Sequence, residues 1–98
     1  MTIMHHPPHP GEFIKATYLV PFRLSVRFLA EHLKVAPSTI NRLIKKEGGV
    51  TPEMVKRLSV TVGRSPESWL AMQAKYDLWM TRQPKLKKID FSKFEAVA

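Results

Sequence analysis

The side chains best suited to recognition chemistry gather in one short stretch of the chain, residues 36–46. An arginine guanidinium can donate two hydrogen bonds to guanine, an asparagine amide can pair with adenine, and a serine hydroxyl can serve a base or a phosphate. Ser38, Asn41 and Arg42 offer these three groups at spacings of three and four residues, which place them on one side of a helix. The stretch therefore carries what a helix needs to contact bases in a DNA major groove.

Residues at the edges of this stretch fit the same chemistry. Ala36 and Pro37 at its leading end can touch a thymine methyl group, while Arg27 and Lys46 are suited to phosphates. Backbone amides at a helix start near Ser25 can also bind phosphate. The full predicted set of DNA contacts is Ser25, Arg27, Ala36, Pro37, Ser38, Thr39, Asn41, Arg42, Lys45 and Lys46.

The charge of the chain also favours a polyanionic partner. The 98 residues include 16 Lys and Arg against 8 Asp and Glu, a formal net charge of +8. The excess is concentrated in residues 23–47 and 82–98. A basic surface of this kind suits nucleic acid or an anionic membrane, and a merely solvated basic surface is the alternative.

Other chemistries find little support. The chain has no cysteine, so disulfides and thiol chemistry are excluded, and a reducing compartment is expected. Tyr76 and Asp77 lack a nucleophile or second carboxylate, so we expect no enzyme. His5, His6 and His9 have no acidic or thiol partner, so we expect no metal and no cofactor. Without a spanning apolar run or a signal-peptide pattern, a cytoplasmic protein is expected.

Five helices are predicted to position these side chains. Their approximate ranges are 10–18, 25–33, 37–46, 52–62 and 66–82. A serine or threonine stands at the expected cap of the second, fourth and fifth helices. Pro21 is expected to end the first helix, Gly48-Gly49 the third and Gly63 the fourth.

The second and third of these helices have the layout of a helix-turn-helix. A break of three residues joins them, and the small Ala30 permits their close approach. Apolar residues fill the positions at which the two helices would contact each other: Leu29, Leu33, Val35, Ile40 and Leu43.

The fifth helix is apolar on two sides, which indicates burial on two sides. One of these sides is expected to face a partner subunit, although core packing of the same aromatic residues is an alternative. The predicted dimer contacts are Trp69, Leu70, Met72, Tyr76 and Trp79.

These features together resemble a known family. Residues 25–79 resemble the phage-repressor-like helix-turn-helix proteins, and HPGEFIK, GGVTPEM and the W-L-x-x-Q-x-x-Y-D-L-W run are similar to HigA antitoxins of bacterial type II toxin–antitoxin systems. The resemblance implies an all-α, five-helix lambda-repressor-like fold and a homodimer on a palindromic operator. It also implies repression of the protein's own operon and neutralisation of a ribosome-dependent mRNA-cleaving toxin.

The chain is expected to divide into a flexible arm (1–9), a DNA-binding and dimerisation domain (10–82), which the resemblance covers, and a basic tail (83–98). The tail suits a strand, an amphipathic segment or disorder, and its lysines suit phosphate or toxin contacts.

Two positions depart from the family pattern. Lys34 replaces the usual turn glycine, which costs about 1 kcal/mol if φ is positive. Ala36 replaces the usual capping hydroxyl. We therefore expect a strained or reshaped turn.

Two other functions remain open. A stand-alone regulator, phage-like or ligand-sensing, would share the DNA-binding helix but have no toxin partner. A helix-turn-helix used only for protein binding is the second alternative, and the charge of residues 37–46 argues against it.

Overall fold

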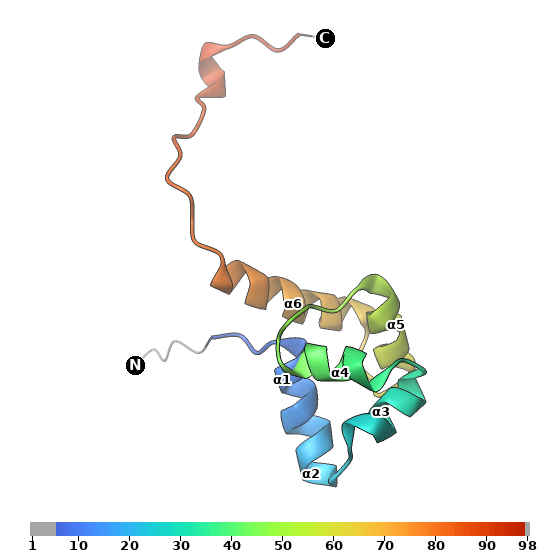
Figure 1. The fold of residues 1–98 in the computed structure, drawn as a ribbon. Coiled ribbons are helices and arrows are strands. Elements are labelled where there is room, and N and C mark those ends of the chain that lie inside the picture. The colour runs from blue at the N-terminus through green and yellow to red at the C-terminus, as the bar shows by residue number, and fades with distance from the viewer. Residues whose placement is uncertain (1–5, 98) are drawn as a thin grey trace.

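A computed structural model describes residues 6–97 (Figure 1). The elements in chain order are α1 (Pro10–Ile14), the π-helical η1 (Lys15–Leu19), α2 (Val20–Phe22), α3 (Val26–Leu33), α4 (Pro37–Ile44), α5 (Pro52–Thr61), α6 (Pro66–Met80) and the 3₁₀ turn η2 (Phe91–Lys93). Because α1, η1 and α2 follow one another without a break, they form a single first helix. All five predicted helices are present in the described range, and every regular element there is helical, which confirms the all-α fold.

The first helix does not end before Pro21, as the sequence predicted, but continues to Phe22. The Val20 N–H donates to the Lys15 carbonyl five residues earlier, the hydrogen bond of a π-helix. In an α-helix a proline removes a hydrogen bond and its ring clashes with the carbonyl four residues earlier. The wider π turn directly before Pro21 changes this spacing, which explains how the helix continues.

The first helix, α3 and α4 each end in a Schellman motif in which an arginine or lysine occupies the position that is usually glycine. Arg23, Lys34 and Lys46 have φ values of 55°, 58° and 61°. After each of them the next N–H donates to a carbonyl five residues earlier, as from Val35 to Ala30 at 3.0 Å. A side chain at such a position costs about 1 kcal/mol relative to glycine. The strained turn expected at Lys34 is therefore present.

The end of α4 differs from the prediction. We expected Gly48-Gly49 to end this helix, but it ends at Ile44. Lys46 turns the chain out of the helix, and the Glu47 N–H donates to the Arg42 carbonyl at 2.9 Å. The glycines follow in a loop that leads to α5.

The core lies between the first helix, α3, α4, α5 and α6. Trp69 is fully enclosed, and its Nε1 donates to the Gly63 carbonyl at 2.9 Å, so its one polar atom is satisfied. The buried apolar residues are Ile14, Leu19, Leu29, Ala30, Leu33, Ile40, Leu43, Val50, Val55, Leu58, Trp69 and Met72. They include every predicted contact between the second and third helices except Val35, which is partly buried.

The two ends of the chain behave differently from each other. His9 is buried and caps α1, so the prediction of a flexible arm is wrong at this residue, and His5 lies outside the described residues. Residues 81–97 are exposed and leave the helices as an extended tail (Figure 1). Its only regular element is η2, so the strand considered for the tail is not formed there.

Candidate nucleic-acid interface

α3 and α4 form the predicted helix-turn-helix, and local signals in the sequence define its ends. The Ser25 hydroxyl accepts a hydrogen bond from the Phe28 N–H at 3.0 Å, which caps α3. Pro37 opens α4 in the first turn, where a proline is tolerated because it has no N–H to satisfy. Ala36 makes no side-chain cap, as its departure from the family pattern predicted.

The outer face of α4 is polar and open. Ile40 and Leu43 point into the core, whereas Ser38, Asn41 and Arg42 are exposed. Within residues 6–97, no intramolecular side-chain hydrogen bond or ion pair involves any of these three, or Lys45 after the helix. Their donors and acceptors are therefore available to an external partner.

Most of the remaining predicted contacts also lie at the surface. Arg27, Ala36, Pro37 and Lys46 are exposed, while Thr39 is half-buried on the side of α4 toward α5. Ser25 is exposed, but its hydroxyl already caps α3, so it would offer the helix start rather than a free side chain.

A shallow hollow lies between the first helix and α4. Its floor is apolar, and its charged and amide groups are Lys15, Arg23, Asn41 and Lys45, with no acidic residue among them. Asn41 and Lys45 were predicted as DNA contacts, whereas Lys15 and Arg23 were not. The hollow therefore extends the positive surface from α4 to the first helix.

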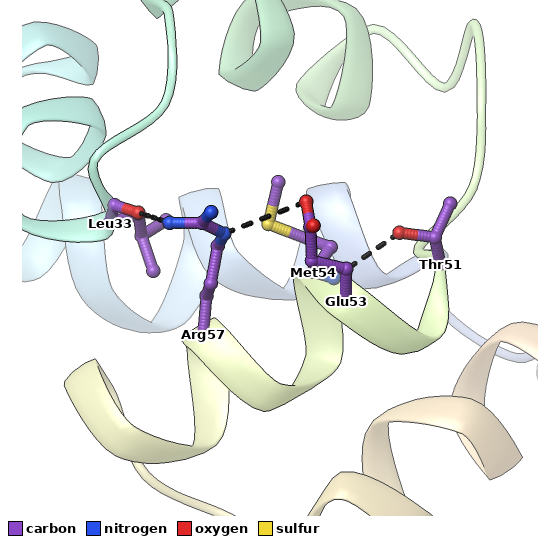
Figure 2. Close-up of polar contacts among 5 residues, drawn as sticks. All are labelled: Leu33, Thr51, Glu53, Met54 and Arg57. Carbon is purple, nitrogen blue, oxygen red and sulfur yellow. Dashed lines mark hydrogen bonds and ion pairs between the residues drawn. The ribbon is translucent and has the colours of Figure 1, made fainter.

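Arg57 on α5 holds the end of α3 (Figure 2). Its guanidinium donates to the Leu33 carbonyl at 2.8 Å, and its Nε lies 3.7 Å from the Glu53 carboxylate one helical turn earlier. The Thr51 hydroxyl caps the start of α5 by accepting a hydrogen bond from the Met54 N–H at 3.2 Å. Sequence reasoning missed the role of Arg57, because its partner lies 24 residues away.

A histidine clasp, formed by His9, fixes the loop after α4. Its Nδ1 accepts from the Gly11 N–H at 3.0 Å, and its Nε2 donates to the Gly48 carbonyl at 2.9 Å. The ring of Tyr76 lies edge-on to the imidazole, with 4.9 Å between centroids. Burial lowers the pKa of His9, since the enclosed site disfavours the charged ring. Both nitrogens are thus used by a neutral imidazole.

Two further contacts fix α4 and its loop against the rest of the domain. Gly11 touches the backbone of α4 so closely that an added Cβ would lie 1.9 Å from the Leu43 carbonyl oxygen. The Gln73 side chain on α6 accepts from the Val50 N–H at 3.0 Å. Sequence reasoning missed these positions as well, although His9, Pro10 and Gly11 stand at a clear helix start.

The predicted dimer contacts divide into two groups. Trp69 and Met72 are buried within the subunit itself, so the prediction that they contact a partner is corrected: they are core residues. Tyr76 is half-buried against His9. Leu70 and Trp79 are 40% and 53% exposed and remain available to a second subunit.

The described residues contain no cluster of three or more His, Asp or Glu side chains that could hold a metal ion. Among the helices described, none combines the length and the apolar character needed to cross a bilayer.

Comparison with known proteins finds relatives of this chain in both sequence and structure. No family model matches the chain. It is 43% identical to virulence-associated protein I of Dichelobacter nodosus, over 79% of the chain and 71% of that protein. It is 35% identical to antitoxin HigA-1 of Vibrio cholerae, over 89% of the chain and 82% of that protein. A structure of the Pseudomonas aeruginosa antitoxin HigA with the higBA promoter superposes with a TM-score of 0.69 and 33% identity, covering 74% of this chain and 78% of that one.

Proposed function

Because this chain belongs to the HigA family of helix-turn-helix antitoxins, we propose that it binds operator DNA through α4 as a homodimer and represses its own operon. The observation that carries this proposal is the outer face of α4. Its amide, guanidinium and hydroxyl groups are exposed and make no side-chain hydrogen bond or ion pair within the described part of the subunit, while Ile40 and Leu43 pack the opposite side of the helix into the core.

The proposed binding geometry follows from the fold. Each subunit would place α4 in one major groove, with Ser38, Asn41 and Arg42 toward the bases and Lys45 toward phosphate. A two-fold dimer then requires two half-sites separated by about 10 base pairs or a multiple of this length. Leu70 and Trp79 on α6 are the proposed dimer contacts, since they are the exposed members of the predicted set.

The second part of the proposal is neutralisation of a toxin. Membership of the HigA antitoxin family supports a cognate toxin, which we propose cleaves mRNA on the ribosome, and it also supports a cytoplasmic location. Neither role of the antitoxin requires catalysis by this chain.

A stand-alone regulator is the second candidate. It is favoured by a relative named only as the HTH-type transcriptional regulator YddM, from Escherichia coli, which is 39% identical over 80% of the chain. A stand-alone regulator would bind DNA in the same way but would have no toxin. Co-purification of the full chain with the product of the adjacent gene distinguishes the two candidates, because only the antitoxin is expected to form a stable complex.

The DNA-binding proposal is tested by footprinting the purified full chain on the DNA upstream of its gene. We expect two protected half-sites and an affinity that falls steeply between 50 and 200 mM salt, since phosphate contacts release counterions. Equal affinity for the upstream DNA and for an unrelated duplex would contradict operator recognition.

A further inference from the structure

All non-glycine residues with positive φ in the described range are basic: Arg23, Lys34, Lys46 and Arg64. The left-handed backbone favours glycine, and asparagine is the usual substitute. Lys and Arg make up only 16 of the 98 residues, so composition alone does not explain why cations hold all four positions. The positive charge shared by these four residues therefore needs an explanation of its own.

The side chain of Arg64 makes contacts within the subunit that explain its charge. Its guanidinium lies over the ring of Phe13 at 5.0 Å and over the ring of Trp69 at 5.6 Å from their centroids. These distances are typical of cation–π contacts, which stabilise the fold. Arg64 is therefore explained without an external partner.

The other three cations have no such contact. Arg23, Lys34 and Lys46 are exposed, and within residues 6–97 their side chains make no hydrogen bond or ion pair. All three occupy the same position of a Schellman motif, at a helix C-terminus. A cation there interacts favourably with the helix dipole, which gives a purely structural alternative.

The positions of Arg23, Lys34 and Lys46 favour a role in binding over this structural alternative, because all three residues lie around α4. Arg23 lines the hollow beside α4 together with Asn41 and Lys45. Lys34 stands in the turn that leads into α4, and Lys46 stands in the turn that leaves it. The three cations thus frame the exposed recognition face on one side and at both ends.

We propose that Arg23 and Lys34, together with Lys46, contact the DNA sugar-phosphate backbone, and that their charge is retained at strained positions because it serves binding rather than folding. The inference rests on the proposed function, in which α4 enters the major groove. It adds two contacts from outside the recognition helix and gives a reason for the departure from glycine at Lys34. Such contacts set affinity and register without reading sequence.

The test compares the full-length variants Arg23→Gly and Lys34→Gly with the unaltered protein. Affinity is measured on the upstream DNA and on an unrelated duplex over a salt series, and stability is measured by thermal unfolding. Each variant is expected to lose about fivefold to tenfold in affinity for both duplexes at 0.1 M salt, with a salt slope smaller by about 0.9. The melting temperature is expected to stay equal or rise, because glycine relieves the strain.

Arg64→Gly is the matched control. It removes one positive charge from another residue with positive φ, in the turn before α6 rather than in a Schellman motif, and it is expected to leave affinity and salt slope unchanged. Lys34→Asn serves as a second variant at the turn, because asparagine tolerates the left-handed conformation while lacking the charge.

The outcomes separate the alternatives. Affinity losses in Arg23→Gly and Lys34→Gly no larger than that in Arg64→Gly would overturn the inference. A lower melting temperature with unchanged affinity would also overturn the inference, and would show that these side chains serve to stabilise the helix C-termini. If the unaltered protein binds DNA without salt dependence, the proposed function itself fails, and the inference fails with it.

Discussion

At the scale of single residues, Arg42 offers the sharpest test of the recognition face. Its side chain is exposed on α4 and makes no polar contact in the described part of the chain, so the fold does not depend on it. Arg42→Ala is expected to weaken operator binding by about 1–3 kcal/mol and to leave the helical content unchanged. A gel-shift titration with circular dichroism measures both.

Lys56→Ala is the control for Arg42, because Lys56 is a cationic residue exposed on α5 rather than on α4. Equal operator affinity of the Arg42 variant and the unaltered protein would remove Arg42 from the interface.

His9 gives the fold a pH dependence of known sign. Because burial lowers the pKa of His9 in the folded state, the unfolded chain binds the proton first as pH falls below the ordinary histidine pKa of 6.5. Stability should therefore decrease from pH 6.5 downward until the folded protein also takes up the proton. Protonation of Nδ1 would also break its hydrogen bond from Gly11.

His9→Asn tests this effect, since asparagine can cap a helix but does not titrate near neutral pH. Thermal unfolding at pH 7.5 and 5.5 should show a larger loss of stability on acidification for the unaltered protein than for His9→Asn. An identical loss in both proteins would show that other groups cause the pH dependence.

The residues that could be predicted from the sequence are those whose partners are close in the chain. The caps at Ser25, Thr51 and Ser65 each use an N–H three residues later, so local sequence is sufficient to find them. His9 and Arg57 use carbonyls 39 and 24 residues away, and nothing local indicates which carbonyl. Long-range polar contacts of this kind require the fold itself.

At the scale of elements, the position of α4 depends on its contact with the first helix at Gly11. An added Cβ would meet the Leu43 carbonyl oxygen at 1.9 Å, and backbone atoms cannot move aside as a flexible side chain can. Gly11→Ala is therefore expected to cost about 1–3 kcal/mol in the free energy of unfolding, or more if the helices separate. Urea denaturation measures this loss.

Gly48→Ala is the matched control for Gly11→Ala, because an added Cβ there meets no atom within 4 Å. A Gly11→Ala variant as stable as Gly48→Ala would contradict the close approach of the first helix to α4.

The existence of the helices was predictable, but two of their ends were not. Apolar spacing, together with a capping hydroxyl for α3, α5 and α6 and a first-turn proline for α4, was sufficient to find these helices, because the signals are local. The first helix continues through Pro21 by forming a π turn, which proline statistics do not anticipate. α4 ends at Ile44, and Lys46 with its positive φ turns the chain away before the glycines that were predicted to end the helix.

At the scale of the whole molecule, the exposed apolar side chains of α6 bear on how two subunits meet. The exposed apolar side chains of α6 that were predicted as dimer contacts are Leu70 and Trp79. Leu70→Ala and Trp79→Ala are expected to raise the dimer dissociation constant by roughly tenfold or more, because a few large anchor residues carry most of the binding energy of an interface. Sedimentation equilibrium measures the change.

Val20→Ala is the control for the dimer, because Val20 is 63% exposed but lies on the first helix rather than on α6. Dissociation constants that do not differ among the three variants would exclude this face of α6 as the interface. Sequence patterns identified an apolar helix, but only the fold separates its core residues from its surface residues.

One of the two tryptophans of the chain is buried and the other is exposed. Their intrinsic fluorescence can therefore report on two different parts of the protein. Trp69 is fully buried, whereas Trp79 is 53% exposed near the end of α6. In the native subunit a dissolved quencher should reduce the fluorescence of Trp79 but not that of Trp69. Association through α6 should shield Trp79 from the quencher. The red shift that follows exposure of Trp69 should instead report loss of the core. Assembly and unfolding can thus be followed separately in one unlabelled sample.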